Sequence, residues 1–255
     1  QACPQEAGNG DPLTLGVKGR NVLIAGDPQS GKSWLAGLLA EQMILQQYNV
    51  CIIDPEGDYA TVESLPGVIV LGTNEPPPCT SEILRLLRYP DVSVVVDLSR
   101  MEQAEKCEQA RRLLSMLVEQ RRCTGLPHRI VIDEAPHLGF SPKVCDNPVP
   151  IMSRLKTFIE INKVRLILSG THETLEMISR TTHLHRRANN IFLKHYEIHK
   201  EEDRRNFHGF IKSIQAYVPG MSALNAGGNL TRVLMQGSLG SPGFALNWII
   251  TACTS

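Results

Sequence analysis

The sequence has no excess of charge of either sign. Its 26 Lys and Arg residues balance 26 Asp and Glu residues over a length of 255, so the formal net charge is zero. A strongly basic domain favours a nucleic-acid partner through electrostatics alone, and this composition gives no such signal. We therefore leave nucleic acid open as a partner that the overall charge does not support.

Paired cysteines and long apolar runs are also missing. The seven cysteines are an odd number and no two stand at C-x-x-C spacing, which favours reduced thiols over a disulfide framework or a zinc site. No run approaches the roughly 18 apolar residues that cross a bilayer, and no signal peptide opens the chain. We expect a cytoplasmic protein with no membrane association. Because its first residue is Gln1 rather than Met, we interpret the chain as a piece of a longer protein.

Short apolar runs alternate with amphipathic patterns along most of the chain. Apolar runs predict strands at residues 21–25, 49–53, 67–71, 92–96, 129–132 and 164–168, and helical spacing predicts helices at 33–47, 81–88, 101–122 and 151–162. Continuous apolar strands between helices are typical of a parallel sheet covered on both faces. The predicted fold is a three-layer α/β fold with a mostly parallel central sheet.

Composition divides the chain into three segments. Residues 1–12 are polar and contain Gly and Pro, which predicts a linker. Residues 13–212 carry the alternating pattern and form the predicted domain. Residues 213–255 contain one charged residue, Arg232, many glycines and no clear period, so we treat them as an appendage of uncertain structure.

A phosphate-binding loop follows the first predicted strand. The segment from Gly26 to Ser33 fits G-x-x-x-x-G-K-[ST], in which the glycines let backbone N–H groups turn toward phosphates. Lys32 is expected to reach the β and γ phosphates of ATP, and Ser33 to ligate Mg²⁺. The bare pattern arises by chance in about one chain in a hundred, but here a strand precedes it and a helix follows. The nucleotide-binding candidates are Gly26, Asp27, Pro28, Gln29, Ser30, Gly31, Lys32, Ser33 and Trp34.

Two adjacent acids end the predicted strand at residues 129–132. In P-loop enzymes an acid at this strand end holds the Mg²⁺ shell, and a second acid can act as general base on the attacking water. We assign Asp133 to the metal and Glu134 to the base. The alternative is a solvated strand end, where acids are common, but active sites gather at the carboxyl ends of parallel strands.

Polar residues also follow the strand at residues 164–168. Thr171 and His172 are placed to sense the γ-phosphate if their strand lies between the other two site strands. The alternative is an ordinary turn or helix cap, where Thr is frequent.

The acidic turn Asp54-Pro-Glu-Gly-Asp-Tyr59 completes a set of motifs with a family resemblance. Together with Gly26–Ser33, Ile130–Ala135 and Leu168–His172, it resembles the HerA/FtsK superfamily, which are RecA-like ATPases that include DNA translocases and conjugation ATPases. The resemblance covers residues 12–200 and implies a RecA-like fold, homo-oligomers, and a group from a neighbouring subunit in each site. His172 stands where the family usually has Gln, and Pro136 where a His is common.

A second resemblance concerns the segments Ser30–Gln42 and Gly125–Glu134. They are similar to a bacterial group in which this ATPase region follows a haloacid-dehalogenase-type phosphatase domain. That resemblance implies a phosphatase domain before Gln1, because the chain itself has no D-x-D-[GT] phosphatase start.

The motifs favour Mg²⁺-dependent ATP binding and hydrolysis by a module coupled to a partner domain. A ring-forming DNA translocase or helicase motor is the main alternative. A small-molecule kinase is less favoured, since no acceptor lid is recognisable. The arginine pairs at 121–122 and 204–205 are interpreted as solvated faces. They are also candidates, together with Lys163, for the group supplied to a neighbouring subunit.

Overall fold

The computed structural model describes residues 20–73, 78–138, 164–172, 188–215 and 228–254, and they form two compact units. The first unit takes in residues up to Ala25 and from Lys32 to Phe192, and contains the central sheet. The second combines the segment Gly26–Gly31 with residues from Leu193 onward. Each unit is described separately below.

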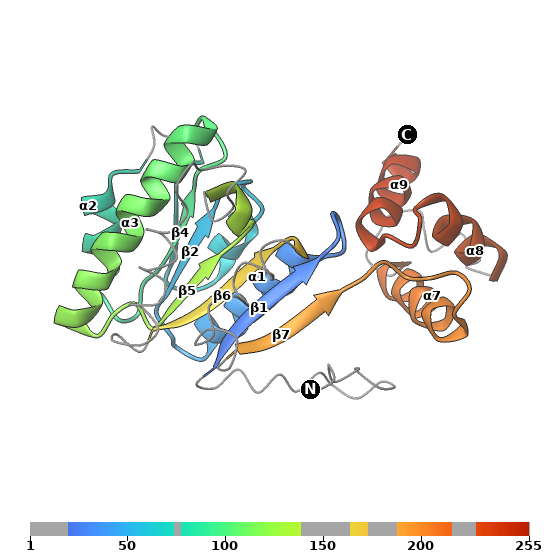
Figure 1. Ribbon diagram of the computed structural model, residues 1–255, viewed down its shortest axis with the longest axis horizontal. Helices are drawn as coiled ribbons and strands as arrows, with labels where there is room; N and C mark the ends of the chain where they lie inside the picture. The colour runs from blue at the N-terminus through green and yellow to red at the C-terminus, as the bar shows by residue number, and fades with distance from the viewer. Residues whose placement is uncertain (1–19, 74–77, 139–163, 173–187, 216–227, 255) are drawn as a thin grey trace. The chain divides into compact units, whose positions relative to one another are not determined.

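The first unit is built on a seven-stranded sheet with the order β3-β4-β2-β5-β6-β1-β7. Pairing from β3 through to β1 is parallel throughout, and β7 runs in the same direction beside β1 (Figure 1). The strands are β1 (Asn21–Gly26), β2 (Val50–Asp54), β3 (Val68–Leu71), β4 (Ser93–Asp97), β5 (Arg129–Ile132), β6 (Arg165–Gly170) and β7 (Ala188–Leu193). Because β1, β2, β4 and β5 are buried along their whole length, they read as continuous apolar runs rather than alternating ones.

Helices cover both faces of this sheet. Alternate strand residues such as Ile53, Val96 and Ile132 form one core with α2 (Thr80–Leu86) and α3 (Gln103–Thr124). The intervening residues point to the opposite face, where α1 (Lys32–Leu45) packs against β2 and β6. Two short 3₁₀ helices, η1 (Ala60–Ser64) and η2 (Ala135–Leu138), follow β2 and β5. The chain therefore has the expected three-layer α/β fold.

The second unit contains three helices. They are α7 (Glu201–Gln215), α8 (Gly228–Gly237) and α9 (Pro242–Thr254). Their apolar sides meet in a small separate core. Its buried members are Phe207, Ile211, Leu234, Met235, Ala245 and Ile249.

The strand predictions are confirmed at all six positions, with ends that shift by one or two residues. β7 was not predicted, and the predicted helix at 151–162 lies outside the described residues. The described part of 213–255 is helical, and α7 runs through residue 213 without a break. The domain limits at 12 and 212 stay predictions.

Candidate functional site

The sheet order brings the predicted site strands together. β6 lies between β5, which leads into the acid pair, and β1, which leads into the phosphate loop. In register, Ile132 of β5 lies opposite Leu168, and Ala25 of β1 lies opposite Gly170. The residues that follow these three strands consequently emerge at one edge of the sheet, as the interpretation of Thr171 and His172 required.

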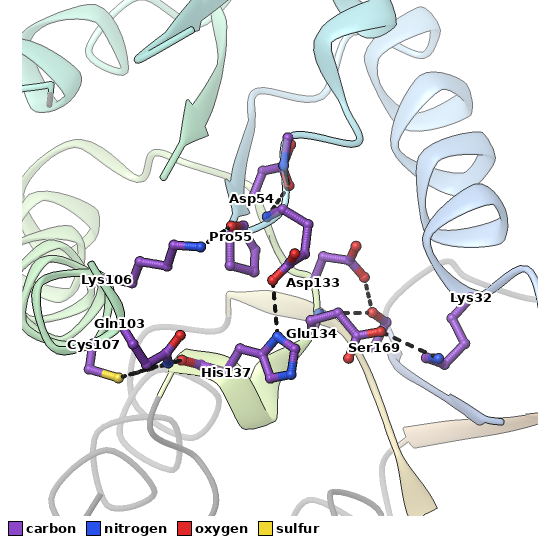
Figure 2. Close-up of polar contacts among 12 residues, drawn as sticks. Lys32, Asp54, Pro55, Gln103, Lys106, Cys107, Asp133, Glu134, His137 and Ser169 are labelled. Carbon is purple, nitrogen blue, oxygen red and sulfur yellow. Dashed lines mark hydrogen bonds and ion pairs between the residues drawn. The ribbon is translucent and has the colours of Figure 1, made fainter. Parts of the chain in front are cut away.

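Asp133 is a fully buried carboxylate held from one side. The hydroxyl of Ser169 on β6 donates a hydrogen bond to Asp133 Oδ1 (Figure 2). Burial raises the pKa of Asp133, while hydrogen bonds from Ser169 and Ser33 act in the opposite direction without cancelling the rise. The other carboxylate oxygen, Oδ2, is buried and has no hydrogen-bond partner among the described residues. A buried acceptor without a partner lowers the stability of the fold unless a ligand donates to it or coordinates it.

Glu134 faces the lysine of the phosphate loop. Its Oε1 lies 3.3 Å from Lys32 Nζ, and the two side chains are 18% and 5% exposed. The backbone N–H of Glu134 donates to Ser169 Oγ at 3.2 Å, so one serine contacts both acids. Glu134 has φ +39°, in the left-handed region that non-glycine residues rarely adopt. A strained backbone conformation therefore coincides with the position of the carboxylate that contacts Lys32.

The acidic turn after β2 is organised by Asp54. Its carboxylate accepts hydrogen bonds from the backbone N–H groups of Glu56, Gly57 and Tyr59, at 3.1, 2.8 and 3.0 Å. Burial nevertheless raises the pKa of Asp54 to about 6. The Tyr59 hydroxyl is buried with no hydrogen-bond partner among the described residues. Burial raises the pKa of Tyr59, and the negative charge of Asp133 adds to the effect.

A second layer of contacts ties this turn to η2 and α3. Glu56 Oε1 lies 3.0 Å from His137 Nδ1, three residues after Glu134. Lys106 Nζ donates to the carbonyl of Pro55 at 2.7 Å, and Cys107 Sγ donates to the carbonyl of His137 at 3.4 Å (Figure 2). These contacts join the acidic turn to η2, which follows the acid pair, and both of them to α3. Sequence reasoning missed them, because the partners are 30 to 81 residues apart.

The phosphate loop adopts the turn that its glycines allow. Gln29 and Gly31 have φ +58° and +93°, and the N–H of Ser30 donates to the Asp27 carbonyl at 3.2 Å. A Cβ at Gly31 would meet no atom within 4 Å, so open space adjoins the turn. A Cβ at Gly26 would lie 2.3 Å from the Leu193 carbonyl oxygen, so this position excludes any side chain.

Within the second unit, residues from the C-terminal part of the chain form hydrogen bonds with the phosphate loop. The carbonyl of Gln29 accepts two hydrogen bonds, from Ser241 Oγ and from the N–H of Gly243, each at 3.1 Å. His195 Nε2 lies 3.0 Å from the Pro28 carbonyl. No sequence signal indicated these contacts, because Ser241 stands 212 positions after Gln29.

The remaining predicted residues are more exposed. Trp34 has an exposed fraction of 71%. Thr171 is partly exposed, while His172 is exposed and its ring packs 4.3 Å from that of Phe192 on β7. The structure thus brings Lys32, Ser33, Asp133 and Glu134 together, while Thr171 and His172 directly follow β6.

The arrangement fits a magnesium nucleotide. The unpartnered Oδ2 of Asp133 and the neighbouring Ser33 hydroxyl are oxygen donors of the kind that Mg²⁺ prefers. Lys32 supplies a buried ammonium, and the loop before it has open space beside Gly31. A phosphate-bearing ligand therefore finds both its cationic partner and its metal partner here.

Comparison with known families agrees with this geometry. Residues 19–120 match the family described as "Helicase HerA, central domain". The match supports a HerA/FtsK-type P-loop ATPase domain in this region. The match ends before β5, so Asp133 and Glu134 lie outside it and their assignment stays a prediction. The upstream phosphatase domain stays a prediction.

Other comparisons add little to the HerA-like assignment. No curated protein matches the chain. Two solved Drosophila structures align with much of the chain. "Structure of Drosophila ORC bound to DNA" is 11% identical and covers 65% of this chain and 91% of that chain. "Structure of Drosophila ORC bound to AT-rich DNA and Cdc6" is 13% identical and covers 88% of this chain and 81% of that chain. Both have a TM-score of 0.27, which is too low to support an argument. Among the helices that the structure describes, none combines the length and apolar character needed to cross a membrane.

Proposed function

We propose that this HerA-like domain binds ATP with Mg²⁺ and hydrolyses it by in-line attack of water. The observation that carries the proposal is the set of contacts around Ser169. This one hydroxyl positions the buried Asp133 and the backbone of Glu134, whose carboxylate lies 3.3 Å from Lys32 Nζ. Charge neutralisation and positioning supply most of the catalysis in phosphoryl transfer, and these residues supply both.

Each residue has a separate role in this proposal. Lys32 neutralises charge on the β and γ phosphates, while backbone N–H groups of Gly26–Gly31 surround them. Ser33 and Asp133 would hold Mg²⁺, which would supply charge neutralisation at the phosphate oxygens. Glu134 Oε accepts a proton from the attacking water, and the Ser169 contact keeps its backbone in place.

We also propose that Thr171 and His172 respond to the γ-phosphate. They directly follow β6, between the strands that lead to the phosphate loop and to the acid pair. The contact of His172 with Phe192 gives such a response a route to β7.

Direct binding and turnover measurements test the ATPase proposal. The unmodified protein should bind ATP in a Mg²⁺-dependent manner and release phosphate slowly, whereas Lys32→Ala should lose most of its phosphate affinity. Lys212→Ala, which removes an exposed lysine of α7, is the matched control. Equal ATP affinity in Lys32→Ala and the control would contradict the proposed site.

The partner of the ATP cycle separates two versions of the function. We favour a module coupled to a partner domain, because the net charge is zero. The match to a helicase family supports the alternative, a ring-forming DNA motor. The affinity of a protein for the DNA phosphate backbone falls steeply as the salt concentration rises. The test is therefore the ATPase rate measured against duplex DNA concentration at two salt concentrations. A large, salt-sensitive stimulation supports the motor, and a flat response supports the coupled module.

Assembly is part of the same proposal. A site of this superfamily takes a group from a neighbouring subunit, so we expect ATP-dependent homo-oligomers and a specific activity that rises with protein concentration. Sedimentation velocity with and without ATP measures the assembly. A strict monomer with concentration-independent activity would exclude it.

A further inference from the structure

A second concave site lies in the C-terminal helical unit, and none of the residues assigned to ATP lines it. It is a pocket of about 910 Å³ between α7 and α8, within the range of about 300–1,000 Å³ typical of small-molecule sites. α7 presents Glu201, Arg204, Arg205 and His208 to it, which are three to four positions apart and therefore share one face of the helix. Arg232 of α8 also lines it.

The lining has a clear excess of positive charge. Three guanidinium groups, on Arg204, Arg205 and Arg232, face a single carboxylate, Glu201. In the part of the chain that the structure describes, no ion pair joins Glu201 to any of the three. The nearby Asp203 is already engaged, since it accepts a hydrogen bond from the Glu197 N–H at 2.7 Å. The sequence suggested solvated arginines at 204–205, and the structure has both exposed to solvent where they line this hollow.

The walls of the pocket are fixed in position. His208 Nδ1 lies 2.7 Å from Thr231 Oγ1, which links α7 to α8. Arg204 donates to the Ile198 carbonyl at 3.4 Å, which holds its guanidinium near the rim. Met235 belongs to both the pocket lining and the buried core of the unit. Cationic groups on a packed two-helix frame form a site with limited freedom to collapse.

We propose that this pocket binds a small molecule that carries a diphosphate or longer polyphosphate group. Guanidinium forks match phosphate oxygens in a bidentate manner, and three forks on two helices can engage more than one phosphate group. Ile198 and Met235 supply apolar surface for the rest of such a ligand. A nucleoside diphosphate and an inorganic polyphosphate share this chemistry.

The test uses the whole chain with Lys32→Ala, so that the phosphate loop contributes little. Isothermal titration with pyrophosphate should show saturable binding at one site per chain. Adding Arg204→Gln and Arg232→Gln, one from each wall, should weaken it at least about tenfold for loss of two charge-assisted contacts. The matched control is Arg111→Gln with Arg122→Gln, two exposed arginines of α3 that remove the same charge.

Each outcome decides the proposal. ADP that displaces pyrophosphate with the same arginine dependence identifies a nucleotide, and pyrophosphate binding that ADP does not displace identifies an inorganic polyphosphate; either supports the pocket. Absent saturation, or equal weakening in the control, overturns it. Arginine-dependent binding of a short DNA duplex without saturable pyrophosphate binding also overturns it. Circular dichroism checks folding, and Arg205→Gln alone repeats the test if the double variant unfolds.

Discussion

Lys32 and Glu134 form an ion pair across the candidate site, with Nζ 3.3 Å from Oε1, although they are contributed by a helix start and a strand end about a hundred positions apart. The ammonium that should meet the γ-phosphate is thus shared with the carboxylate that should activate water. Phosphate binding and the freeing of the base are coupled through one lysine.

The first prediction concerns Glu134→Gln. Turnover should fall at least about a hundredfold, the usual weight of a general base. ATP should bind more tightly than to the unmodified protein, because a carboxylate no longer competes with phosphate for Lys32. Phosphate release and equilibrium ATP binding measure the two effects. Glu108→Gln, an exposed residue of α3, is the control, and normal turnover in Glu134→Gln would refute the assignment.

The second prediction concerns Ser169→Ala. The change removes a donor to Asp133 and an acceptor for the Glu134 N–H, both in a buried setting. We expect the free energy of unfolding to fall by roughly 1–3 kcal/mol. Turnover should fall by about tenfold, with a smaller change in ATP affinity. Ser115→Ala removes a serine hydroxyl that donates to the Arg111 carbonyl in the same helix, and it is the matched control. Equal turnover in the two variants would show that Ser169 has no positioning role.

A third prediction concerns pH and Asp54. Its pKa of about 6 in the folded chain lies above its ordinary value of 3.8. The folded state therefore binds this proton more tightly than the unfolded state. The resulting contribution of Asp54 to the free energy of unfolding is fully present below pH 3.8 and is lost as the pH rises through 6. Asp54→Asn should remove roughly 3 kcal/mol of this pH dependence. Denaturant unfolding between pH 4 and 7 measures it, with Asp58→Asn at an exposed position of the same turn as control. An unchanged slope in Asp54→Asn would contradict the assignment.

The fourth prediction compares two glycines. Gly26→Ala would place a methyl group 2.3 Å from the Leu193 carbonyl and should cost at least about 2 kcal/mol. Gly209→Ala, in α7 with no atom within 4 Å, should instead stabilise by about 0.5–1 kcal/mol. Thermal unfolding of both variants gives the comparison. Similar melting temperatures would show that Leu193 does not constrain the loop.

Sequence patterns predicted the parts of the fold that are locally encoded. The buried strands around Ile53, Val95 and Ile132 have continuous apolar runs, and the phosphate loop has a fixed spacing of Gly and Lys. β7 was missed because Asn189 and Asn190 interrupt its apolar pattern. The role of Ser169 was missed because a serine in a strand has no distinctive spacing, and its importance comes only from the pairing of β6 beside β5.

The second unit shows a different limit. Residues after 212 include one charged residue. The charged positions that usually mark the solvent-facing side of an amphipathic helix are therefore almost missing from this part of the sequence. The pocket on α7 and α8 combines residues from 198 to 236, and a run such as Arg204-Arg205 looks the same whether it faces solvent or a hollow. Only the packing of the two helices distinguishes these cases.

The hydrogen bond from Ser241 to the Gln29 carbonyl has a consequence for how the protein is made. A ribosome adds about 5–20 residues per second, and 212 positions separate the two residues. Roughly 10 to 40 s therefore pass between the synthesis of the phosphate loop and that of the serine that holds it. During that interval the nascent chain carries Gln29 without its Ser241 contact. The complete nucleotide loop is for this reason a product of late folding, and premature termination before residue 241 yields a chain in which the loop never gains this support.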